Sequence, residues 1–203
     1  LKQWKESVYR KPLILRGARQ VGKTWLLKEF GRQQYQSTAY FNFDEHAEYQ
    51  QFFATTKDVK RILMNLSIAS GQPIEPGKTL VIFDEIQECP AALNTLKYFC
   101  ENLPELSVAC AGSLLGIART RPASFPVGKV DFLSMGPMNF SEFLRALGDG
   151  NLAAYLETID TIAPLPDAFF NPLAEKLKMY FVTGGMPEAV RLWAETHDTA
   201  RVE

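Results

Sequence analysis

The sequence contains few of the residues from which metal centres and disulfide frameworks are built. Only three cysteines and two histidines occur among its 203 residues. No cysteine pair has the CxxC spacing of a zinc site, so the sequence argues against structural zinc. Cys89, Cys100 and Cys110 are therefore expected to be free thiols in a reducing cytoplasm.

The sequence also lacks a signal peptide, an apolar run long enough to span a membrane, and an excess of charge of one sign. Its formal net charge is −1, so the overall composition does not indicate a nucleic-acid partner, although a local basic patch can hide in a neutral average. A soluble cytoplasmic protein of one domain, or of one domain and part of another, fits this length. The chain begins at Leu1 rather than Met and ends at Glu203 without a closing signal, so we expect a fragment of a longer protein.

What the sequence does contain is an alternation of apolar runs with helix-like segments. Strands are predicted at 13–17, 39–43, 79–85, 106–112 and 129–135. Helices are predicted from Lys23 to Phe30, with Gly31 closing the helix, and from Ala91 to Asn102. Strands that alternate with helices predict an α/β fold with a parallel sheet.

The pattern changes near residue 139, after which only helices are predicted. We place an α/β core at 1–138 and a small helical lid or linker region at 139–203, with the Pro-rich stretch 163–172 as a linker or turn. Asn139 or Ser141 is expected to cap a helix with Glu142 in its first turn. Gly184 to Pro187 predicts a turn before a helix that begins near Pro187. Five phenylalanines are expected to be core or an interface to a further domain: Phe140, Phe143, Phe169, Phe170 and Phe181.

The most informative stretch lies between the first strand and the first helix and fits the phosphate-loop pattern GxxxxGK[ST] at every required position. Glycines let the loop turn its backbone N–H groups toward phosphate oxygens, and the following helix adds its N-terminal dipole. Lys23 would reach the β- and γ-phosphates, and Thr24 would offer its hydroxyl to Mg²⁺. The predicted nucleotide-binding residues are Gly17, Ala18, Arg19, Gln20, Val21, Gly22, Lys23 and Thr24.

A phosphate loop needs an acidic partner, and Asp84 and Glu85 follow a continuous apolar run. Asp84 would hold Mg²⁺, and Glu85 would polarise a water molecule for in-line attack on the γ-phosphate. A carboxylate beside the magnesium acid favours hydrolysis over phosphoryl transfer, because a kinase has to avoid activating water. Ser113 ends the fourth predicted strand and is a candidate catalytic sensor of the γ-phosphate; capping of the next short helix is the alternative role.

These features together resemble the prokaryotic AAA-type ATPases of the AAA+ superfamily that carry an uncharacterised C-terminal domain. The resemblance runs from Trp4 to about Val190 and rests on RKPLILRGARQVGKTWLLKEFG, TLVIFDEIQECP, AGSLLG, SFPVGKVDFLSMGPMNFSEFL and YFVTGGMPEAV. It implies a phosphate-loop NTPase with strand order 5-1-4-3-2, a helical lid, and a C-terminal domain absent from this chain. That domain is thought of as a DNA-binding or nuclease-like module. A DNA or protein partner and a homo-oligomer stay open.

Three functions remain as hypotheses. The first is an ATPase that uses ATP and Mg²⁺ and couples hydrolysis to a conformational change in the attached domain. The second is a nucleotide-dependent switch with slow or no turnover, and the third is a small-molecule kinase. ATP is expected over GTP, because no Asn-Lys-x-Asp guanine motif occurs. An arginine finger could come from Arg119, Arg121 or Arg19; Lys129 occupies a position that is often Arg in the family but cannot contact phosphate in a bidentate way.

Overall fold

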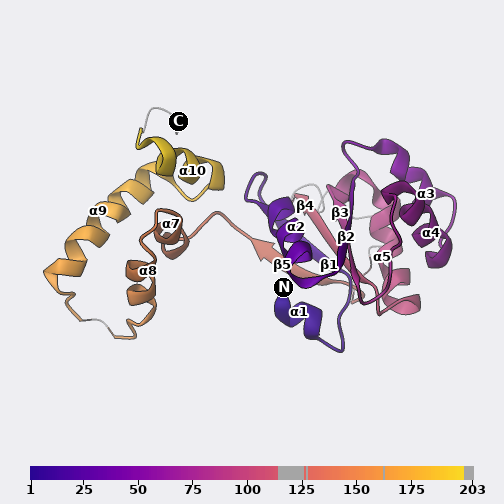
Figure 1. Cartoon of the computed structure of the whole chain (residues 1–203), viewed down its shortest axis with the longest axis horizontal. Coiled ribbons are helices and arrows are strands. Elements are labelled where there is room, and N and C mark those ends of the chain that lie inside the picture. Colours follow the sequence, from indigo (N-terminus) through magenta and orange to yellow (C-terminus); the bar gives the residue numbers. More distant parts are fainter. Residues whose placement is uncertain (114–125, 127, 162, 199–203) are drawn as a thin grey trace. The chain divides into compact units, whose positions relative to one another are not determined.

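The computed structural model describes residues 1–113, 126, 128–161 and 163–198, and the chain divides into two compact units (Figure 1). Unit 1 comprises Leu1–Met135 and unit 2 comprises Gly136–Glu203. The candidate functional site lies in unit 1.

Unit 1 is built on a five-stranded sheet with the order β2-β3-β4-β1-β5. All pairings within it are parallel. The strands are β1 (Leu13–Gly17), β2 (Ser37–Asn42), β3 (Thr79–Asp84), β4 (Ser107–Ser113) and β5 (Asp131–Met135). The predicted order 5-1-4-3-2 and the α/β class are thus confirmed.

The central strands are apolar on both sides because helices cover both faces of the sheet. In β3, every residue is buried. Alternate residues of the strand enter different cores: Val81 and Phe83 join one, and Leu80 and Ile82 join the other. This alternation follows from the two-residue repeat of a strand, and it holds the carboxyl end of β3 rigidly in the middle of unit 1.

The helices of unit 1 divide between these two cores. Helices α1 (Lys2–Glu6) and α2 (Lys23–Gln34) contribute Trp4, Leu27 and Phe30 to the core around Leu80. The opposite core takes side chains from α3 (Gln51–Ala54), α4 (Val59–Ser70) and α5 (Pro90–Asn102). The 3₁₀ helix η1 (Ala47–Gln50) packs beside α3. A second 3₁₀ helix, η2 (Ile86–Glu88), follows β3 directly.

The prediction that Gly31 closes the first helix is wrong, since α2 continues to Gln34. A Cβ atom on Gly31 would lie 2.4 Å from the Thr38 Oγ1 atom of β2. The glycine is therefore needed for the close approach of helix and strand, not for termination.

Unit 2 consists of helices α7 (Phe140–Ala146), α8 (Gly150–Glu157), α9 (Asp167–Thr183) and α10 (Pro187–Thr196) among its described residues. The expected capping box is present, with Asn139 as the cap and Glu142 as its partner, and α10 begins at Pro187 as predicted. Residues 163–172 are only partly a linker, because α9 already begins at Asp167 and accommodates Pro172. Pro172 is the sixth residue of this helix, so it removes one backbone hydrogen bond and crowds the carbonyl of Ala168, a cost that the packing of the long helix must outweigh.

The small core of unit 2 contains Leu144, Ala153 and Leu173. Phe143 is fully buried and Phe140 packs against this core, so these two phenylalanines are core residues as expected. Phe170 and Phe181 are exposed, by 52% and 76%, and their expected role as an interface stays a prediction.

Two stretches that are distant in sequence are joined inside unit 2. The backbone N–H of Met138 donates to the carbonyl of Gly185 at 2.7 Å, and the Tyr180 hydroxyl donates to the carbonyl of Met138, also at 2.7 Å. A Cβ atom on Gly185 would lie 2.1 Å from that Met138 oxygen. Only glycine permits this approach, so the sequences around residues 138 and 185 are explained by packing.

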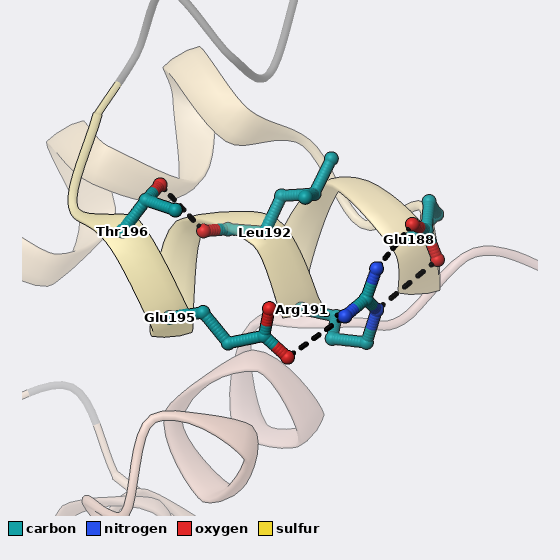
Figure 2. Close-up of polar contacts among 5 residues, drawn as sticks. All are labelled: Glu188, Arg191, Leu192, Glu195 and Thr196. Carbon is teal, nitrogen blue, oxygen red and sulfur yellow. Dashed lines mark hydrogen bonds and ion pairs between the residues drawn. The ribbon is translucent and has the colours of Figure 1, made fainter.

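The surface of unit 2 carries exposed ion pairs along its helices. In Figure 2, Arg191 lies between Glu188 and Glu195 on α10, with N–O distances of 2.6 and 2.8 Å. The Thr196 hydroxyl of the same helix donates to the Leu192 carbonyl at 2.7 Å. Within the residues that the structure describes, no helix is both long enough and apolar enough to cross a membrane.

Candidate nucleotide-binding site

The predicted phosphate loop connects β1 to α2 and has the backbone that its glycines allow. Gly22 has φ 92°, and Gln20 has φ 63°, a left-handed conformation that is uncommon for a residue with a side chain. A Cβ atom on Gly17 would lie 2.1 Å from the Met135 carbonyl oxygen of β5, so this position also requires glycine. The loop is thus fixed between two strands at the start and a helix N-terminus at the end.

Lys23 is a cation buried at the first position of α2, with 7% of its surface exposed. Its Nζ donates to the carbonyls of Gly17 at 3.2 Å and Ala18 at 2.6 Å. Burial lowers the pKa of Lys23, and the negative charges of Glu85 and Asp84 only partly oppose this shift. A buried ammonium held by loop carbonyls at a helix N-terminus fits a phosphate group as its counterion.

Asp84 ends β3, with only 4% of its surface exposed, and receives two hydroxyl groups. Thr24 Oγ1 and the Tyr40 hydroxyl both donate to Asp84 Oδ2 at 2.8 Å. Burial and then the hydrogen bond with Asp84 raise the pKa of Tyr40, which therefore stays a donor. The Thr24 and Asp84 oxygens are ligands of the kind that Mg²⁺ prefers.

Glu85 follows Asp84 in a left-handed conformation with φ 49° and ψ 47°. Its N–H donates to Asp84 Oδ1 at 3.0 Å, and its carboxylate accepts a short hydrogen bond from Gln87 Nε2. A left-handed conformation in a residue with a side chain costs about 1–3 kcal/mol and persists where the surroundings enforce it.

Lys23, Thr24 and Glu85 line one cavity of about 420 Å³. A cavity of this size is in the range of small-molecule sites. Its lining combines a helix N-terminus and a buried cation with carboxylates, as a site for a magnesium–phosphate ligand would require. The described residues that line it are Arg19, Gln20, Gly22, Lys23, Thr24, Trp25, Asp44, Glu85, Gln87 and Glu88.

Ser113 lies at the end of β4, in register with Gly17 of the neighbouring strand β1. Its backbone N–H donates to Gln87 Oε1 at 3.3 Å. The strand end is therefore next to the loop and to the Glu85 partner, while the sensor role of its hydroxyl stays a prediction.

The candidates for an arginine finger have different surroundings. Arg19 is exposed and lines the cavity, whereas Lys129 forms an exposed ion pair with Glu101 at 2.9 Å. Arg119 and Arg121 lie outside the described residues.

Tyr40 and Gln87 contact the predicted acids but were not predicted from the sequence. Tyr40 alternates with Ala39 and Phe41 in β2, and the neighbour relation of β2 and β3 carries it toward Asp84. The alternation of side chains along β2, taken together with the strand order, could have predicted that Tyr40 lies near Asp84. Gln87 had no comparable signal, because its contact depends on the turn that follows β3.

A parallel sheet of this order, with a phosphate loop after β1 and acids at the end of β3, defines the AAA type of phosphate-loop nucleotide-binding domain. Residues 9–144 match the family described as AAA domain, and the chain belongs to this family. The three cysteines are free, as expected. No curated protein matches the chain.

Solved structures with the same fold include three proteins of low sequence identity. C. elegans PCH-2 is 14% identical over 98% of this chain and 58% of its own, with a TM-score of 0.51. Drosophila ORC bound to DNA is 15% identical over 90% and 54%, with a TM-score of 0.53. The Thermotoga maritima RuvB Holliday junction branch migration motor is 13% identical over 96% and 56%, with a TM-score of 0.52. The chain thus spans a little over half of each of these proteins, and the likeness concerns the fold alone.

Proposed function

We propose that this protein binds ATP with Mg²⁺ and hydrolyses it to ADP and phosphate. The observation that carries the proposal is that Lys23, Thr24 and Glu85 line one cavity, with Asp84 hydrogen-bonded to the Thr24 hydroxyl and to the Glu85 N–H. The loop N–H groups and Lys23 would hold the phosphates, and Thr24 and Asp84 would hold the metal ion. Bound magnesium would neutralise charge on the transferring phosphoryl group.

Glu85 would act as the general base. It lines the cavity, and its carboxylate accepts from Gln87, whereas Thr24 and Tyr40 hold the Asp84 carboxylate. Asp84 is thereby committed to the metal, and Glu85 is left to accept a proton from the attacking water. Ser113 Oγ, at the end of the adjacent β4, would sense the γ-phosphate.

We propose further that hydrolysis drives a conformational change in a domain attached to the helices of unit 2. ORC in its solved structure is bound to DNA, and RuvB is a branch migration motor. These two proteins support a DNA partner for this chain, with ATP turnover coupled to movement, and a protein partner or a homo-oligomer is the alternative. Arg19, exposed at the cavity, is the described arginine best placed to act on a nucleotide phosphate.

A second candidate is a nucleotide-dependent switch with slow turnover. The pairing of Lys129 with Glu101 favours it, because a lysine engaged in an ion pair is a poor substitute for an arginine finger. Nucleotide binding would then be retained in the absence of appreciable hydrolysis.

Phosphate release from Mg-ATP by the complete protein, over a range of protein concentrations that includes any oligomer, tests the proposal. Glu85→Gln is expected to lower kcat by about 10²- to 10⁴-fold while nucleotide affinity is kept. Glu75→Gln, in an exposed ion pair with Lys78, is the matched control and should keep the native rate. Binding without release at every concentration would leave the switch and reject the ATPase.

A further inference from the structure

Gln87 is a buried amide that contacts two parts of the candidate site. It lies in η2, immediately after the two acids, with 5% of its surface exposed. Its Nε2 donates to Glu85 Oε2, and its Oε1 accepts from the backbone N–H of Ser113 at 3.3 Å. A longer contact of 3.5 Å runs from Nε2 to Glu88 Oε1. The buried side chain therefore faces an acceptor on one side and a donor on the other.

These partners allow only one orientation of the amide. An ionised carboxylate accepts hydrogen bonds and cannot donate them, whereas a backbone N–H donates and cannot accept. Rotating the amide of Gln87 by half a turn would place oxygen against oxygen at Glu85 and N–H against N–H at Ser113. Because only 5% of the side chain is exposed, each bond is costly to lose, so the two contacts fix each other.

The bridge also connects Glu85 to the strand beside the phosphate loop. Ser113 is paired in register with Gly17, the first residue of the loop. A path of direct contacts thus runs from the start of the loop through the end of β4 to Gln87 and then to the Glu85 carboxylate. A shift of the β4 end would change the position of the Gln87 amide, and through it the orientation of Glu85.

We propose that Gln87 is a positioning residue that holds the Glu85 carboxylate in its working orientation and couples it to the end of β4. This inference rests on the proposed function, since it assigns Gln87 a role through the general base. Gln87 lines the same cavity, but its hydrogen bonds go to Glu85, Glu88 and Ser113 and not to the loop or Lys23, so it should govern the rate of the chemical step and leave nucleotide affinity unchanged.

Two variants separate the contacts. Gln87→Met keeps the length of the side chain but loses both hydrogen bonds. Gln87→Glu keeps an acceptor for the Ser113 N–H and opposes the Glu85 carboxylate with a second carboxylate. Each is expected to lower kcat for phosphate release by about 10- to 100-fold, a part of the full effect of a general base, with the Kd for ATP changed by less than about threefold.

Action through Glu85 also requires that the effects do not add. In a Glu85→Gln background, Gln87→Met should lower the residual rate by less than about twofold, because the group that it positions is already gone. Gln50→Met is the matched control, since Gln50 also donates its amide to η2, at the Glu88 carbonyl, but lies away from the cavity lining. It should leave kcat within about twofold of the native value.

The outcomes separate this inference from the proposed function. If the native protein and Gln87→Met release phosphate at the same rate, Gln87 has no positioning role and the proposed ATPase activity stands. A slow Gln87→Glu variant would not change this conclusion, because repulsion between the two carboxylates would explain it. If both variants lose ATP affinity together with rate, Gln87 supports the fold of the site and the proposal is wrong. If the native protein releases no phosphate, the function and the inference fall together.

Discussion

The two units of the chain differ in whether they bury charged side chains. In unit 1, Lys23 and Asp84 are buried, and they are the only buried ionisable lysine and carboxylate among the described residues. In unit 2, the described ion pairs are partly or fully exposed, as in the Arg191 cluster of Figure 2. Burying a charge costs free energy that a surface pair avoids. The cost is concentrated where a ligand would repay it, which locates chemistry in unit 1.

The units also differ in what explains their distinctive sequence motifs. Under the proposed function, Gly22 and Lys23 in the loop of unit 1 are explained by a ligand, because they would shape a phosphate site. In unit 2, the Gly184-Gly185 turn and the segment before α7 are explained by each other, through the contacts of Met138 with Gly185 and Tyr180. A distinctive motif therefore indicates function in one unit and packing in the other.

The largest expected effect is on the packing of unit 2. Gly185→Ala would drive a Cβ atom to within 2.1 Å of the Met138 carbonyl, and backbone cannot move aside cheaply. We expect the variant to lose about 3 kcal/mol or more of unfolding free energy in unit 2. Amide hydrogen exchange across α7, α9 and α10 measures it, and native protection there would contradict the assignment.

The control for that variant is Gly150→Ala, in the same unit. Gly150 begins α8 and has no atom within 4 Å of an added Cβ. Alanine should be neutral there or stabilise unit 2 by up to about 1 kcal/mol. Nucleotide binding in unit 1 should survive both substitutions, which keeps the comparison of the units sharp.

A smaller effect is expected for Lys23→Met in unit 1. Native protein at 100 times the Kd of ATP gains about 2.7 kcal/mol of unfolding free energy, and the variant should gain none. A thermal shift with and without Mg-ATP measures this difference. A retained shift would refute the assignment of the phosphate loop.

The same substitution has a second readout in the absence of nucleotide. Burial lowers the pKa of Lys23, so the unfolded chain binds this proton more tightly than the folded chain. The native stability contributed by this group is therefore lowest below the folded-state pKa and rises with pH toward the ordinary value of about 10.4. Lys23→Met should lose this rise, whereas the exposed Lys60→Met should keep it.

The smallest effect is expected on the surface of unit 2. Arg191→Met removes exposed pairs with Glu188 and Glu195, whose carboxylates raise the pKa of Arg191. The midpoint of thermal unfolding should fall slightly, and the difference should vanish in about 1 M salt, where screening acts within about 3 Å. A large fall in the midpoint that does not depend on salt would contradict this expectation. It would show that the stability of unit 2 depends on Arg191, as that of unit 1 depends on its buried charges.

Sequence patterns predicted the features that depend on local periodicity or fixed spacing. The apolar run of β3 and the spacing between Lys23, Thr24 and the two acids belong to this class. The strand order came from the family resemblance. The left-handed backbone of Glu85 could not be predicted, because nothing in its own side chain requires it.

The features that the sequence did not predict depend on contacts between residues that are far apart in the sequence. Tyr40 reaches Asp84 from a neighbouring strand, and Gln87 reaches Ser113 across a turn, so both needed the register of the sheet. Gly31 was misread because a glycine serves helix ends and close packing equally well. The start of α9 was placed too late because Pro172 is a helix breaker by local preference, whereas the packing of the whole helix keeps it inside α9.

The position of β1 in the sheet has a consequence for biosynthesis. This strand lies between β4 and β5, both of which come far later in the chain. During translation, the residues that carry the phosphate loop leave the ribosome long before either neighbour exists, and pairings so distant in sequence form slowly. The loop therefore gains its support only once Met135 has emerged, and nucleotide binding by nascent chains would report completion of the whole sheet.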